Sequence, residues 1–96
     1  MSVEIGSFIV CTPGVVGGRP RIDGTRVTVR SVALCYKQGL MPEEIVQQYE
    51  RLTIAQVYAA LTYYHANRDE IEADIAAENA LYDLALKEQQ QLRRNV

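Results

Sequence analysis

The helical spacing of apolar residues that begins near Thr28 constrains the fold more than any other feature of the sequence. Its first segment has apolar residues at i, i+3, i+4 and i+7, between Thr28 as an N-cap and Gly39 where a helix-ending glycine belongs. Its second segment opens with Pro42 and two glutamates, which suit a first helical turn, although Met41 is a poor cap. We predict a first helix between Thr28 and Gly39 and a short second helix from Pro42 to Tyr49.

The third segment has the clearest start signal in the chain. Thr53 and Gln56 are spaced as a capping box, and Leu52 and Val57 as a hydrophobic staple. Residues 50–52 separate this helix from the second, which matches a helix-turn-helix, although any trihelical bundle gives a similar pattern. We expect the inward face to hold Ile54, Val57, Tyr58, Leu61 and Tyr64, and the outward face Thr53, Ala55, Gln56 and Ala59.

The N-terminal arm contains short extended pieces. The stretch "SFIVCT" is enriched in residues that favour strands, and Pro13 and Gly14 end it. Asp23 and Gly24 stand between "PRI" and "TRVTV", which predicts a short hairpin with a type I′ turn. Strands with so few apolar residues are not stable alone, so the arm either pairs with another copy or lies on the helices.

The tail from Arg68 to Val96 contains no glycine or proline and begins with another capping signal, Asn67 with Glu70. Its apolar stripe is broad but interrupted. A helix of this length cannot bury its whole stripe on so small a core, so we expect a second surface on a twin copy or on a different protein. The predicted organisation is a strand arm plus trihelical domain over residues 1–67 and a helical extension over residues 68–96.

The length and the charge of the chain limit the functions that it can have. A chain of 96 residues makes one modest domain. The net charge of -2 hides an asymmetry: residues 1–40 have five basic and two acidic side chains, whereas residues 41–96 have five basic and ten acidic ones. Any anionic partner should therefore meet the first half, unless the halves pair with each other. The sequence has neither a membrane span nor a signal peptide, which predicts a cytoplasmic protein with Cys11 and Cys35 as free thiols.

Two stretches resemble a bacterial family, "GGRPRIDGTRVTV" and "MPEEIVQQYERLTIAQVYAALTYYHANRDEIE". The resemblance, to the family known as domain of unknown function 433, covers roughly Phe8 to Glu72. It implies a homeodomain-like trihelical fold and, for many members, an antitoxin of the VapB kind that acts beside a PIN-like ribonuclease toxin. Met41 and Glu50 depart from the family pattern, which often has a serine or threonine before the P-E-E motif and a proline after the tyrosine.

Catalysis finds little support in the sequence. The lone histidine, His65, has no cysteine or serine spaced to form a nucleophile and base pair, so we interpret it as a capping or packing residue. The acidic pairs near helix starts suit the helix dipole better than a metal, and Gly17 with Gly18 is too sparse for a phosphate loop. We predict a protein that is not an enzyme and needs no cofactor or metal.

DNA binding is a stronger hypothesis, but the third helix holds no lysine or arginine. Because affinity for DNA depends largely on neutralised phosphates, the cations must come from elsewhere. Arg26 is set aside, since we expect it to pair with Glu43 or Glu44, whereas Arg19 and Arg21 flank a proline and look freer. The predicted DNA-binding residues are Arg19, Arg21, Arg30 and Arg51 for phosphates, Thr53 for a phosphate, and Gln56 for adenine.

The sequence thus predicts a mainly α, homodimeric or larger antitoxin that neutralises a PIN-like toxin through its tail and binds operator DNA through its first half. Two alternatives stay open: a stand-alone helix-turn-helix regulator, and a protein-binding dimer that does not bind DNA. The predicted partner-binding residues are Ile71, Ile75, Leu81, Tyr82, Leu84, Arg93 and Arg94.

Overall fold

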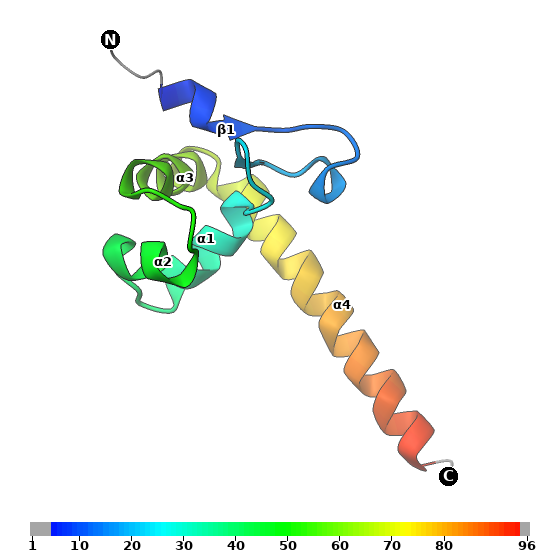
Figure 1. Ribbon diagram of the computed structural model, residues 1–96. Coiled ribbons are helices and arrows are strands. Elements are labelled where there is room, and N and C mark those ends of the chain that lie inside the picture. The colour runs from blue at the N-terminus through cyan, green and yellow to red at the C-terminus, as the bar shows by residue number, and fades with distance from the viewer. Residues whose placement is uncertain (1–4, 95–96) are drawn as a thin grey trace.

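A computed structural model describes residues 5–94, with side chains described for residues 6–92. The fold is mainly helical, with a short N-terminal sheet, a trihelical core and a long projecting helix (Figure 1). Two short 3-10 turns, Ile5–Phe8 and Val16–Gly18, belong to the N-terminal arm. The remaining elements are β1 (Ile9–Val10), β2 (Arg21–Ile22), α1 (Val29–Lys37), α2 (Pro42–Gln48), α3 (Ile54–Ala66) and α4 (Arg68–Arg94).

The helix starts follow the predicted caps. The Thr28 hydroxyl accepts a hydrogen bond from the backbone N–H of Ser31 at 3.1 Å and so caps α1. At α3, Thr53 Oγ1 accepts from the Gln56 N–H at 3.2 Å, and Gln56 Oε1 accepts from the Thr53 N–H at 2.8 Å, which completes the predicted capping box. At α2 the Glu44 carboxylate accepts from the Met41 N–H at 2.9 Å, so Glu44 satisfies a donor at an end where the cap residue has no hydroxyl.

The hydrophobic core lies between the three core helices, β2 and the first turns of α4. Tyr64 is its largest fully buried side chain. From α4 the core includes Ile71 and Ile75, which are 1% and 4% exposed. The core residues are Ile22, Val29, Val32, Ala33, Ile45, Leu52, Val57, Ala60, Leu61, Tyr64, Ile71 and Ile75.

The buried face of α3 differs from the predicted one. Ile54 and Tyr58, expected inside, are 40% and 51% exposed, whereas Ala59, expected outside, is buried. The cause is the N-terminal arm, which lies on α3 and brings Ile9 to the side of the helix that holds Ala59. Of the two predictions for the arm, the structure shows the one in which it covers the helices.

The turn at Asp23 and Gly24 also differs. Gly24 has a φ of +79°, but Asp23 is not in the left-handed region, so the type I′ prediction is wrong. The Ile22 N–H donates to the Val27 carbonyl at 2.9 Å, which keeps part of the expected pairing. The regular partner of β2 is instead β1, antiparallel, with Ile9 opposite Ile22 and Val10 opposite Arg21.

The α3–α4 junction is tight, since Asn67 alone separates the two helices. The Asn67 side-chain amide donates to the Tyr63 carbonyl at 3.1 Å, so it caps the end of α3 and not, as predicted, the start of α4. From there α4 runs for 27 residues and leaves the core as a single straight helix (Figure 1). This projection gives the described chain its elongated shape, 63 × 29 × 24 Å.

Candidate nucleic-acid and partner interfaces

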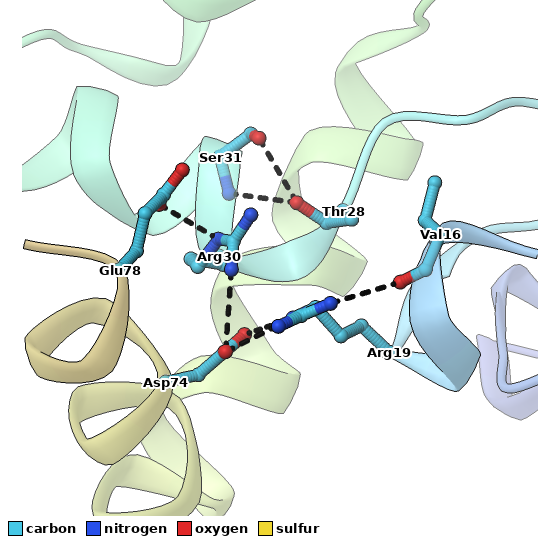
Figure 2. A network of polar contacts seen from close by, with 7 residues as sticks. All are labelled: Val16, Arg19, Thr28, Arg30, Ser31, Asp74 and Glu78. Atoms are coloured by element: carbon cyan, nitrogen blue, oxygen red, sulfur yellow. Dashed lines mark hydrogen bonds and ion pairs between the residues drawn. The ribbon is translucent and has the colours of Figure 1, made fainter. Parts of the chain in front are cut away.

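Two arginines predicted to contact DNA bind an acidic patch on α4 (Figure 2). Arg19 Nε lies 3.0 and 3.1 Å from the two carboxylate oxygens of Asp74, and Arg30 Nη1 lies 3.2 Å from Asp74 Oδ1. Arg30 Nε also lies 3.1 Å from Glu78 Oε2, an ion pair without hydrogen-bond alignment. The basic first half and the acidic second half therefore neutralise each other here. We call Arg19, Arg30, Asp74 and Glu78 the arginine–acid cluster.

The loop before Arg19 is shaped around its guanidinium. Gly17 has a φ of +69°, and a Cβ atom at this position would lie 2.5 Å from Arg19 Nη1. Val16, a β-branched residue, also has a positive φ of 44°, and its carbonyl accepts from Arg19 Nη1 at 3.4 Å (Figure 2). The loop thus directs Arg19 toward α4, and the expectation that Arg19 is a free loop arginine is wrong.

Arg21 is also engaged within the arm. Its Nη1 donates to the Thr25 carbonyl at 2.9 Å, and its Nη2 donates to Thr12 Oγ1 at 3.0 Å. The side chain therefore joins two loops of the arm and is not the freer arginine that the sequence suggested. These contacts leave its positive charge without an acidic partner among the described residues.

A different pair of arginines lies at one open cleft of about 440 Å³. Arg26 and Arg51 are both exposed, and within residues 5–94 neither has a hydrogen bond or an ion pair. The prediction that Arg26 pairs with Glu43 or Glu44 is therefore wrong for this structure. The cleft is lined by Gly24, Thr25, Arg26, Val27, Gln48, Tyr49, Glu50, Arg51 and Leu52.

The start of α3 offers less for base recognition than expected. Gln56 Oε1 is occupied by the capping box, so the amide cannot present both its oxygen and its nitrogen to an adenine while the box is intact. Thr53 is exposed, and its hydroxyl proton is free of the cap, since the oxygen acts there as acceptor. The exposed face of α3 is otherwise largely apolar, with Ile54 and Tyr58 as its large side chains.

The second half of α4 exposes more large apolar side chains than any other element of the described chain. Between Ile75 and Leu92, where the side chains of α4 are described, no further residue is buried. Five large apolar side chains on this segment are exposed to solvent, and we call these five residues the distal stripe. The predicted partner residues Arg93 and Arg94 fall in the last turn of α4, where side chains lie outside the described part of the chain. The distal stripe consists of Leu81, Tyr82, Leu84, Leu86 and Leu92, with exposed fractions of 68%, 65%, 56%, 39% and 67%.

A second polar cluster joins α1, α3 and α4. Glu72 accepts hydrogen bonds from Lys37 Nζ at 2.8 Å and from the Tyr64 hydroxyl. These bonds, from Lys37 first and Tyr64 second, hold the pKa of Glu72 below its ordinary value, and the same carboxylate raises the pKa of Lys37. His65 is exposed, and its ring centroid lies 5.4 Å from that of Tyr36 and 5.1 Å from that of Tyr64, which agrees with packing, one of the two roles predicted for it.

Several other features bear on the candidate function. Cys11 and Cys35 are free thiols, as predicted. Within the described residues, no group of three or more histidine, cysteine or acidic side chains is placed to hold a metal ion. None of the helices in the described part of the chain is long and apolar enough to cross a membrane.

The fold defines a small, mainly helical protein with a trihelical core and a projecting fourth helix. The chain belongs to the family described as "Protein of unknown function (DUF433)", whose family model matches residues 9–64. A crystal structure of a DUF433 member protein from Anabaena variabilis is 37% identical in sequence and similar in fold, with a TM-score of 0.69. The similarity covers 73% of this chain and 69% of that one. No curated protein matches the sequence.

Sequence reasoning missed the two acids of the arginine–acid cluster. Asp74 and Glu78 are four residues apart, so they share one face of α4, and this spacing was a usable signal. Their partner Arg19 stands 55 residues from Asp74, and no local pattern links the two. Sequence reasoning also did not predict that Arg26 and Arg51 line the same cleft, because only the tertiary fold brings their two loops together.

Proposed function

We propose that the protein is an antitoxin that neutralises a PIN-like ribonuclease and regulates its own operon by binding operator DNA. The family resemblance supports the kind of partner, and the distal stripe supports the way in which the partner is held. Leu81, Tyr82 and Leu92 are each about two-thirds exposed on a helix that has already left the core. Apolar side chains gathered on a surface mark a site of interaction, so the protein acts by binding and not by catalysis.

The mode of inhibition follows from the order of residues along α4. Its apolar side chains dock along the toxin, and Arg93 and Arg94 follow one turn or less after Leu92. PIN-like nucleases hold a divalent cation with clustered carboxylates. Guanidinium groups pair strongly with carboxylates, so Arg93 and Arg94 would compete with the cation for those groups.

The test is co-expression with the protein encoded by the adjacent reading frame. The chain is compared with a version that ends after Ala80, which keeps the core residue Ile75 and the arginine–acid cluster but lacks the whole distal stripe. We expect the shortened chain to fold and to lose toxin binding. The double variant Arg93→Ala/Arg94→Ala should still bind while leaving the nuclease partly active, and Lys87→Ala should behave as wild type. Full neutralisation by the chain that ends after Ala80 would overturn the proposal.

A second candidate function is a protein-binding dimer that does not bind DNA. Two observations favour it: α3 has no lysine or arginine on its surface, and Arg19 and Arg30 are paired with acids of the same chain. A gel shift on the upstream region at low salt separates the two candidates. A shifted band supports the operator-binding function, and its absence together with intact toxin binding supports the second candidate.

A further inference from the structure

The cleft between the loop at residues 24–27 and the turn at residues 48–52 has firmly held walls. On the loop side, Thr25 Oγ1 donates to the carbonyl of the fully buried Ile22 at 2.8 Å and accepts from the Val27 N–H at 3.1 Å. Arg21 Nη1 binds the Thr25 carbonyl at 2.9 Å from the other side. The loop that carries Arg26 is therefore fixed at its base.

The opposite wall is anchored in the core. Leu52 is 6% exposed, its N–H donates to the Tyr49 carbonyl at 3.3 Å, and the Tyr49 ring packs against the core. Burial, followed by the neighbouring Cys35, raises the pKa of Tyr49, so its hydroxyl stays protonated. Arg51 stands between Tyr49, which packs against the core, and Leu52, which is part of it. The two arginines thus project from anchored segments on either side of one cleft.

The charge of the cleft is unbalanced. Arg26 and Arg51 face one acid, Glu50, among the lining residues, and within residues 5–94 neither guanidinium has a partner. Elsewhere, Arg19 and Arg30 are both paired with carboxylates. A planar guanidinium has five donors that match the geometry of a phosphate, and a volume of about 440 Å³ lies in the range of ligand sites.

We infer that this cleft binds a phosphate group, with Arg26 and Arg51 on its two sides, and that the backbone of DNA supplies the group. The inference rests on the operator-binding part of the proposed function and names its site. Arg51 lies two residues before Thr53, the cap of α3. When the second helix of a helix-turn-helix lies in the major groove, the first helix crosses the phosphate backbone, so the turn between the two helices lies close to that backbone. DNA therefore fits this position better than an acidic protein segment does.

The test measures DNA affinity against salt for the full-length chain. Fluorescence anisotropy follows a labelled duplex from the upstream region between about 50 and 200 mM salt, where phosphate contacts give a linear dependence of log affinity on log salt. Each phosphate contact accounts for a slope of about 0.9, so Arg26→Ala and Arg51→Ala should each lower the slope by about that amount. The double variant should lower it by about 1.8.

Three variants serve as controls. Lys87→Ala removes one positive charge from an exposed site on α4 and should leave the slope unchanged. Arg51→Lys keeps the charge and should keep the slope, which separates loss of charge from loss of fold. Glu50→Gln removes the negative charge at the cleft and should tighten binding. Circular dichroism and melting curves establish that each variant is folded.

The outcomes separate this inference from the proposed function. If the wild type binds the duplex but the double variant of Arg26 and Arg51 keeps the full slope, the phosphate site is wrong and operator binding stands. If the wild type binds no duplex, operator binding is wrong, and melting curves in inorganic phosphate test the cleft by itself. A phosphate site is supported if phosphate raises the melting temperature of the wild type and not of the double variant. If neither probe binds, both are overturned. If the double variant of Arg26 and Arg51 loses toxin binding but binds the duplex and inorganic phosphate as the wild type does, the cleft binds an acidic protein segment and the inference is overturned.

Discussion

At the scale of single residues, Asp74 has the most consequential contacts outside the core. It accepts hydrogen bonds from Arg19 of the N-terminal arm and from Arg30 of α1 while standing on α4, so one carboxylate joins three parts of the chain (Figure 2). The Asp74 and Arg30 side chains are 20% and 17% exposed, which shields the pair from solvent more than a surface ion pair is shielded. The direction of α4 relative to the core therefore depends on this contact.

We predict that Asp74→Asn lowers the free energy of unfolding by about 1–2 kcal/mol, because a partly buried guanidinium loses its charged acceptor. Urea denaturation measures the change. Asp83→Asn is the matched control, since Asp83 is exposed on α4 and has no partner among the described residues, and it should change stability by less than about 0.5 kcal/mol. Equal stability of Asp74→Asn and wild type would show that the contacts of Ile71, Glu72 and Ile75 hold the helix without the Asp74 contact.

Glu72 gives a prediction about pH. Because hydrogen bonds from Lys37 and Tyr64 lower its pKa in the folded state, its stabilising contribution is present above its ordinary value of 4.5 and is lost as the pH falls below it. The raised pKa of Lys37 has the opposite sign, so that contribution is present below 10.5 and is lost as the pH rises above it.

We therefore expect the melting temperature of Glu72→Gln to fall less than that of wild type between neutral pH and about pH 3, since the variant has no carboxylate to protonate at this position. Glu88→Gln serves as the control, because Glu88 is exposed on the same helix and has no partner in the described chain. A variant of Glu72 with the same acid sensitivity as wild type would contradict the pKa shift.

At the scale of elements, the sequence predicted what short-range physics decides. The capping hydroxyls of Thr28 and Thr53 act within three residues of themselves, so the starts of α1 and α3 could be located before the structure was known. The prediction of the buried face of α3 was wrong because the limits of that face depend on the N-terminal arm. Ile9 contacts the side of α3 that holds Ala59 only after the chain has folded back across 50 residues. The arginine–acid cluster escaped prediction for the same reason.

The structure also shows which part of α4 belongs to the fold. Ile75 belongs to the core, and Asp74 and Glu78 hold the arginines, so the first turns of the helix are structural although the tail was predicted to be an extension from residue 68. The predicted partner residues Ile71 and Ile75 are correspondingly buried and out of reach of a partner. Leu81, Tyr82 and Leu84 remain accessible.

This division predicts opposite results for two shortened chains. A chain that ends after Ala80 should unfold close to wild type, because every described α4 contact with the core lies before that point. A chain that ends after Glu72 loses Ile75 and the arginine–acid cluster, and removal of one buried isoleucine side chain alone costs about 2–5 kcal/mol. Thermal melts compare the two. Similar stability of both chains would contradict the assignment of residues 73–78 to the fold.

At the scale of the whole molecule, the described chain is a compact core from which one long helix, α4, projects (Figure 1). Tyr82 and Leu86 follow Ile75 by 7 and 11 residues, so they continue the buried face of α4 into solvent, whereas Leu84 lies roughly 200° around the helix from Tyr82. Since the N-terminal arm lies on its own α3, we expect the continued face of Tyr82 and Leu86 on the distal stripe to serve self-association. In the free protein we expect a second copy of the chain to cover this face.

We accordingly predict that the free protein is a dimer that dissociates when the continued face is made polar. Light scattering at high micromolar concentration should give the mass of two chains for wild type and of one chain for Tyr82→Ser/Leu86→Ser, because the double change removes the apolar area that drives association. Leu84→Ser removes a comparable side chain from the other side of α4 and should remain dimeric. The chain that ends after Ala80 should be monomeric as well. A wild-type monomer at that concentration would refute dimerisation, and a double variant that stays dimeric would place the dimer contact away from the face that holds Tyr82 and Leu86.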